Sequence, residues 1–296
     1  MKKVVSMLVV LLIAVLAVAA LDFTSVDDTY VKDIDDQKVY DTLKGMLSQA
    51  KTNEEKAEVL WRLSRVCVDL GDQLDDGEKK AKMAIYEEGQ DYADQSLAAN
   101  PSAMAHLWKC CNIGRWGQTK GITASLSKIG DMDDNLKKVF DTYNCLDSSE
   151  AWYTIAVLYS SVPGRSNEKA ISYARAACDT IPSNVIYGGT YKALAEMLYK
   201  RNWSAKKRAT EIAKLQTKWE NETKSNTETY AYYEGAIGAD AMPIWTKTKL
   251  SAMSDRQEAL VILKYAQAVY NVTKYHTKSD DDNYEEIQDL IAQWSK

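Results

Sequence analysis

The chain has 296 residues, of which 46% are hydrophobic and 27% are charged, and its formal net charge at pH 7 is −5. This composition is typical of a folded protein and argues against a disordered chain. The acidic balance without a basic patch argues against nucleic acid as a partner. The 4 prolines and 13 glycines are few for this length, which favours helices throughout.

The first twenty residues have the pattern of a secretory signal peptide. Lys2 and Lys3 precede an apolar run over residues 4–16, and the small residues at 17–20 provide cleavage sites. The run is marginal for a membrane span, so we expect cleavage rather than a retained anchor. The short basic start is typical of a bacterial signal, and the first cysteine, Cys67, lies too far along the chain to carry a lipid at the cleavage site. We therefore expect a periplasmic or secreted protein with no stable membrane anchor.

Residues 21–53 are polar and acidic, with one possible helix over 39–50. A strongly helical pattern begins at residue 54, where an apolar stripe through Leu60, Leu63, Cys67 and Leu70 ends at Gly71. A second helix follows after a charged interruption. Its small residues and the proline beyond its end are Gly89, Ala93, Ser96 and Pro101.

The most regular pattern lies in residues 150–182. Its large and small residues are Trp152, Ile155, Ala156 and Tyr159, followed by Ala170, Ala174, Ala177 and Pro182. This order predicts two helices that pack closely as a tetratricopeptide (TPR) unit. Such a unit must stack on neighbours to bury its apolar face, so one unit predicts others.

The neighbouring segments predict further units. Residues 103–146 form an irregular one with an extra short helix. Residues 188–216 form a fourth, with a first helix marked by Tyr191, Leu194, Ala195 and Leu198 and a second marked by Ala205, Ala209 and Ile212. Residues 217–296 do not repeat the pattern, and we expect them to form a C-terminal helical cap that includes a capping box at Ser254 and Gln257. The predicted fold is an all-α, TPR-like solenoid over residues 54–216.

Specific stretches resemble a known family. They are EVLWRLSRVCVDLG, a Tyr-Glu-x-Gly-x-x-Tyr-Ala run at 86–93, Asn100-Pro101, His106-x-Trp108, Gly121-Ile122 and YSSVPGRSNEKAISYARAACDTIP. Through them, residues 54–216 resemble TPR proteins of the regulator-of-microtubule-dynamics type and their bacterial relatives. Exported spirochaete-type TPR proteins, including those associated with TRAP transporters, are similar in layout. The resemblance implies an all-helical scaffold that binds a partner, and it implies no catalytic residues.

The sequence holds no catalytic, cofactor or metal motif. Its two histidines, His106 and His276, lack a partner for nucleophilic catalysis, and His106 is expected to be bonded within the core. The five cysteines lie in apolar helical surroundings and are expected to be free and buried. We therefore expect no enzyme, no cofactor and no metal site.

The candidate binding residues are aromatic. Five tyrosines in the less regular C-terminal part are candidates for an exposed groove, because aromatic rings are enriched at binding sites. They are Tyr187, Tyr191, Tyr230, Tyr232 and Tyr233. The alternative is that these rings pack the C-terminal cap.

Two functions follow as hypotheses. The first is an exported scaffold that binds a protein or peptide on its concave face. The second is a periplasmic small-molecule-binding or transporter-associated component, with a pocket or pore between the irregular helices that takes a small organic ligand.

Overall fold

The computed structural model describes residues 21–182, 188–222 and 224–296, and within these ranges the regular structure is all helical. The prediction of an all-α fold is confirmed. The predicted signal peptide at residues 1–20 and the candidate Tyr187 lie outside the described residues.

The N-terminal half contains three long helices and several short ones. In chain order they are α1 (Thr24–Asp28), η1 (Thr29–Asp33), α2 (Asp36–Leu47), α3 (Asn53–Asp72), α4 (Lys79–Ala99), α5 (Ala103–Lys120), α6 (Ile122–Ser125), η2 (Leu126–Lys128), α7 (Ile129–Lys137) and η3 (Lys138–Thr142).

The C-terminal half also consists of long and short helices. Its helices are α8 (Ser149–Ser161), α9 (Asn167–Asp179), α10 (Gly188–Arg201), α11 (Ala205–Asn221), α12 (Asn226–Tyr230), α13 (Tyr233–Ile237), η4 (Leu250–Ala252), α14 (Asp255–Val272) and α15 (Lys278–Trp294).

Side-chain caps begin many of these helices. The Ser254 hydroxyl accepts from the Gln257 amide while the Gln257 side chain accepts from Ser254, which is the predicted capping box at the start of α14. Thr52 and Glu55 form a second capping box at the start of α3. Each box satisfies two backbone N–H groups that the helix leaves unpaired, so the helix boundaries follow from local sequence.

The predicted pattern at 150–182 forms the helix pair α8 and α9. Trp152 and Ala156 on α8 and Ala170 and Ala177 on α9 are each 0% exposed, and the two helices pack along each other. The Trp152 ring stacks on Phe140 of η3 with ring centroids 3.8 Å apart. The small side chains let the helices approach, as the spacing predicts, and the indole fills the space between this pair and its neighbour.

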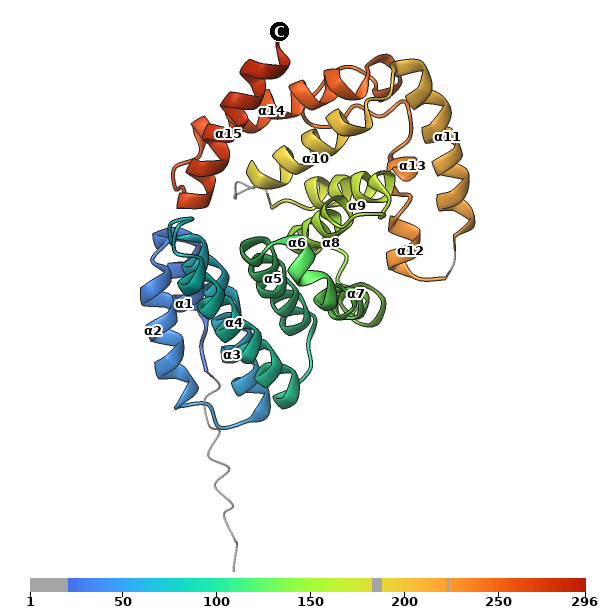
Figure 1. Cartoon of the computed structure of the whole chain (residues 1–296). Helices are drawn as coiled ribbons and strands as arrows, with labels where there is room; N and C mark the ends of the chain where they lie inside the picture. Colours follow the sequence, from blue (N-terminus) through green and yellow to red (C-terminus); the bar gives the residue numbers. More distant parts are fainter. Residues whose placement is uncertain (1–20, 183–187, 223) are drawn as a thin grey trace, which may run out of the picture.

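The predicted fourth pair at 188–216 is wrong in its second helix. The helix that packs along α10 is α14, while α11 packs against α13 and η4 instead (Figure 1). Ala209 of α11 is accordingly only half-buried, and Ile262 and Leu263 of α14 are 0% exposed. The alanine spacing of α11 satisfies the repeat pattern, but the pattern does not determine which neighbour a helix packs against.

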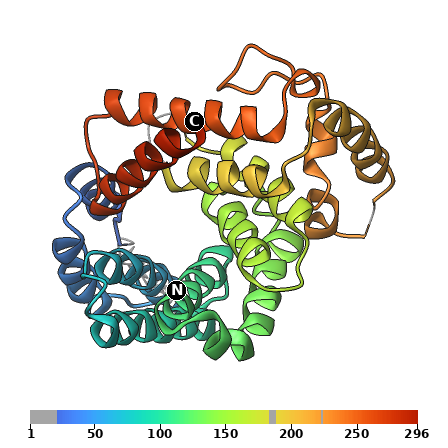
Figure 2. The ribbon, with the colours of Figure 1, turned by 45° about the horizontal axis from the view of Figure 1, so that its top comes forward.

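The chain curves round so that its last helix returns to its first long hairpin. Figures 1 and 2 both place α15 near the turn between α3 and α4. There the Lys278 ammonium donates to the Gln73 carbonyl at 3.1 Å and reaches a carboxylate oxygen of Asp75 at 3.3 Å. Helices that are far apart in sequence therefore enclose a common interior.

The hydrophobic core is continuous through most of this ring. One cluster of buried side chains extends from Leu107 of α5 to Ile287 of α15, and a second holds α2 and α3 together around Leu43 and Leu63. In the described part of the chain, every helix falls short of the length and apolar character that a membrane span requires.

Candidate functional site

The four predicted tyrosines that the structure describes do not form one groove. Tyr191 is 4% exposed and packs edge-on against Trp245 and Tyr265. Tyr230 and Tyr233 lie elsewhere, near Trp152 of α8. Tyr191 is therefore a core residue in this structure, as the packing alternative supposed.

Tyr230 and Tyr233 extend an aromatic stack from the core toward the surface. Tyr230 stacks on Trp152 at 4.3 Å and on Tyr233 at 5.3 Å between centroids, and both rings meet the edge of Trp219. The Tyr233 hydroxyl donates to Asp179 at 3.1 Å. Tyr232 lies beside this stack, half-buried, with the Lys218 ammonium over its ring. These contacts attach α12 and α13 to α8, α9 and α11.

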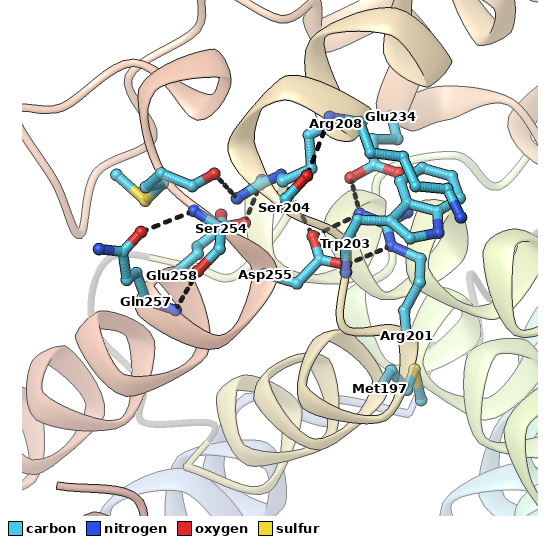
Figure 3. A network of polar contacts seen from close by, with 12 residues as sticks. Met197, Arg201, Trp203, Ser204, Arg208, Glu234, Ser254, Asp255, Gln257 and Glu258 are labelled. Atoms are coloured by element: carbon cyan, nitrogen blue, oxygen red, sulfur yellow. Dashed lines mark hydrogen bonds and ion pairs between the residues drawn. The ribbon is translucent and has the colours of Figure 1, made fainter.

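A buried network of charged side chains joins α9, α10, α11, α13 and α14 (Figure 3). Three arginines and three carboxylates form it, and they are Arg175, Arg201, Arg208, Glu234, Asp255 and Glu258. Arg175 bridges Glu234 at 3.0 Å and Glu258 at 2.8 Å, with all three side chains 0% exposed. Arg201 of α10 pairs with Glu234 and, at 2.8 Å, with Asp255.

The arginines lower the pKa of two carboxyls in this network. Burial alone raises the pKa of the Glu234 carboxyl, but the charges of Arg201 and Arg175 outweigh burial and hold its pKa well below the usual range. The pKa of Glu258 is lowered for the same reason, by Arg175 and Arg208 acting against burial. Each carboxylate is satisfied by more than one guanidinium, which is the condition under which a buried ion pair is tolerated. The network thereby fixes where α10 and α14 lie.

Sequence reasoning missed this network. Arg175 is a charged residue in the middle of an alanine-rich helix, which is a signal of a buried partner. Its carboxylates, however, lie 59 and 83 positions further along the chain, so the sequence does not show which ones meet it.

The candidate functional site is the cleft inside the ring, which we call the inner cleft. Its volume is about 910 Å³, near the upper end of the range for ligand pockets. Its walls come from α3, the α3–α4 turn, α4, α5, α8, α9, α10 and α15. Helices from both ends of the chain therefore face one another across it.

The inner cleft is lined with charged side chains on its walls. Eight are acidic and five are basic, and they are Asp72, Asp75, Asp76, Glu196, Asp282, Glu285, Glu286 and Asp289 with Lys82, Arg115, Lys192, Lys200 and Lys278. The part lined by Tyr153 and Val157 of α8 and Ala193 and Met197 of α10, which we call the floor, is uncharged. The site is therefore polar at its sides and less polar at its floor, with an excess of negative charge.

Several of these charges are already paired. Arg115 of α5 contacts Asp72 at 2.7 Å, and the Tyr86 hydroxyl donates to the same carboxylate at 2.6 Å. Lys192 of α10 forms an ion pair with Glu286 and so links α10 to α15. Glu196, one turn along α10, has a raised pKa because the surrounding protein displaces water and because Glu286 is nearby, although Lys192 acts in the opposite direction.

The histidines and cysteines do not line the inner cleft. His106 is 5% exposed and hydrogen-bonded through Nδ1 to the Asn135 side-chain oxygen at 2.6 Å, as the sequence predicts. All five cysteines are unpaired, as expected, but Cys111 and Cys145 are only half-buried, so the expectation that all are buried is wrong for these two. Burial raises the pKa of the Cys67 and Cys111 thiols to about 12. In the described residues no group of three or more His, Cys, Asp or Glu side chains is placed to hold a metal ion.

Comparisons with known proteins match the N-terminal part. Residues 23–141 match the family model of regulator of microtubule dynamics proteins 1–3. Regulator of microtubule dynamics protein 1 from Bos taurus is 28% identical over 189 residues, covering 56% of this chain and 59% of the relative. The protein of the same name from Pongo abelii is 28% identical over 161 residues, covering 48% and 50%.

These matches cover only part of this chain and part of each relative. The alignments cover 50% to 61% of the length of the curated relatives, and no solved structure matches the chain. The matched family region includes the α3–α5 wall of the inner cleft, whereas the α10 and α15 wall lies beyond it. The segment from α1 into η3 is therefore similar to the regulator-of-microtubule-dynamics family.

Proposed function

We propose that this chain is an exported TPR-type scaffold that binds a segment of a partner protein in the inner cleft. The observation that carries the proposal is the cleft itself, with a volume of about 910 Å³ and walls supplied by both ends of the chain. Stacked helix pairs create concave surfaces of this kind, and such surfaces bind extended partners.

Two further observations support a binding role. The helix pairs α3–α4 and α8–α9 carry the spacing of large and small residues that is typical of TPR units. His106 and His276 are each hydrogen-bonded to a neighbouring group, and three of the five cysteines are buried. Export is proposed from the basic and apolar pattern of residues 1–20.

The relatives support a protein partner. Their names describe regulators of microtubule dynamics, and a regulator of a protein assembly acts through contacts with protein. We carry over to this chain only that general mode of action, a contact with another protein.

Site-specific photocrosslinking tests the proposal. A photoreactive phenylalanine analogue placed at Tyr153, on the cleft floor, should capture a partner protein from envelope extract of the native host. The matched control is the same analogue at Tyr275, which is 49% exposed and outside the cleft. An adduct that is specific to position 153 and disappears in the cleft-filling variant Ala193→Trp is expected. Equal adducts at both positions, or none at 153, would contradict the proposal.

The second candidate function is small-molecule binding, with a transporter-associated role as one form of it. It is favoured by the cleft volume, which lies within the range of pockets for small ligands. A thermal-shift screen against organic acids and amphiphiles tests it with wild type and Ala193→Trp in parallel. A rise in Tm for wild type alone supports this function, and unchanged melting across the set removes it.

A further inference from the structure

We infer that the segment bound in the inner cleft is basic and amphipathic, and that the inward face of α15 is the surface on which its Lys and Arg side chains dock. This inference rests on the proposed function, because it names the chemistry of the partner for that same cleft.

The inward face of α15 carries a continuous acidic stripe. Asp282, Glu285, Glu286 and Asp289 all line the cleft, and their spacing of three, one and three places them on one side of a helix. Glu286 pairs with Lys192. In the described part of the chain no cation contacts the carboxylates of Asp282, Glu285 or Asp289, so three of the four charges are available to a partner.

The cleft also supplies a surface for apolar side chains. Tyr153 and Val157 of α8 and Ala193 of α10 are half-buried and line the floor, whereas Met197, which also lines it, is 4% exposed and offers little surface to a ligand. An uncharged floor below an acidic wall is complementary to a segment with apolar side chains on one side and cations on the other. A small polycation without apolar groups would contact only the acidic wall, and the floor would stay in contact with water.

The free chain already satisfies part of this acidic surface with its own lysines. Lys192 forms an ion pair with Glu286, and Lys278 forms an ion pair with Asp75 where α15 meets the α3–α4 turn. Both carboxylates are well exposed, with side-chain exposures of 62% for Glu286 and 87% for Asp75, so these pairs exchange readily with water and contribute little to stability. They show where an ammonium group fits in this cleft, and an incoming Lys or Arg finds the same geometry.

An unbiased peptide selection tests the inference. A random peptide library displayed on phage is selected against the full chain, and each binder is tested again on Ala193→Trp, which fills the floor. Binders lost on that variant are cleft binders, and we expect them to be enriched in Lys and Arg. The double variant Glu285→Lys/Asp289→Lys should weaken these peptides about tenfold at low salt, with the loss falling as salt rises.

The matched control is Asp91→Lys/Asp134→Lys. It makes the same change in net charge at two exposed carboxylates outside the cleft and should leave affinity within about twofold. Circular dichroism confirms that each variant is folded. Cleft binders without basic enrichment, or equal losses in both double variants, would overturn the inference while the proposed function stands. No peptide sensitive to Ala193→Trp would remove the proposed function itself, and binding of spermine with the same affinity as the peptides would reject a protein segment as the preferred occupant.

Discussion

Two acidic clusters in the described part of the chain have opposite electrostatics. In the C-terminal half, Glu234 and Glu258 are 0% exposed, and the pKa of each carboxyl is lowered by arginines. In the N-terminal half, burial and the charge of Asp36 raise the pKa of Asp69 to about 7. Burial raises the pKa of Asp36 as well.

The difference arises from the partners rather than from burial. Each C-terminal carboxylate contacts two guanidinium groups, whereas Asp69 accepts from the Tyr30 hydroxyl at 2.8 Å and Asp36 accepts from the Gln73 amide at 2.5 Å. The nearest cation, Arg65, stacks on the Tyr30 ring and pairs with Asp27. A neutral donor satisfies an oxygen atom without balancing its charge, so the pKa of Asp69 and Asp36 is raised while the pKa of Glu234 and Glu258 is lowered.

The largest effect is expected where one carboxylate of the C-terminal network is removed. Glu258→Gln leaves Arg175 and Arg208 buried with reduced counter-charge, and we expect the free energy of unfolding to fall by about 3–5 kcal/mol. Urea denaturation followed by circular dichroism measures it. Glu220→Gln, at an exposed position of α11, is the control and should change stability by less than about 0.5 kcal/mol. If the free energy of unfolding of Glu258→Gln fell by less than about 1 kcal/mol, the network would not be what holds these helices together.

The N-terminal pair is expected to make stability depend on pH. Because the pKa of Asp69 is raised in the folded chain, the folded state binds more protons than the unfolded state between pH 4 and 7, and its stability falls as pH rises through that window. Relative to Asp69→Asn, the wild type should lose about 2 kcal/mol between pH 5 and pH 7. Parallel curves for the two proteins over this range would refute the assignment.

The smallest effect is expected at the exposed closure of the ring. Lys278→Ala removes the hydrogen bond to the Gln73 backbone carbonyl and the contact with the exposed Asp75 carboxylate, so the free energy of unfolding should fall by at most about 1 kcal/mol. The sensitive measurement is amide hydrogen exchange in the α3–α4 turn, which should become faster in the variant. High salt should produce the same change in the wild type. Protection that is unaffected by both would show that other contacts close the ring.

The local parts of the fold follow from sequence. Trp152, Ala156, Ala170 and Ala177 have spacings that determine both the helices and their pairing, because the two helices are joined by a short turn. The pairing of α10 with α14 could not be predicted in this way. The intervening residues contain a helix, α11, whose alanine spacing fits the same repeat, and the choice between α11 and α14 depends on contacts such as those between Arg201 and Asp255.

Less of the candidate site than of the fold could be predicted from the sequence. Lys192, Glu196 and Lys200 recur every four residues, which indicates a polar helix face but gives no sign that α15 lies opposite. The acidic stripe of α15 is equally ordinary in sequence, because a solvated face has the same pattern. Only the curvature of the whole chain brings these faces together. Aromatic residues, which guided the prediction, pack the interior at Tyr191 and extend a stack at Tyr230 and Tyr233.

The ring closure near Lys278 has a thermodynamic consequence. Lys278 and Gln73 are 205 positions apart along the chain; Lys278 lines the cleft, and Gln73 lies between the lining residues Asp72 and Leu74. A ligand that touches both sides binds the closed ring in preference to the open one, so its binding free energy adds to the weak closure by mass action, as RT ln(1 + [L]/Kd). Occupancy of the cleft would then be measurable at a distance, as slower amide exchange in the first hairpin and the last helix together.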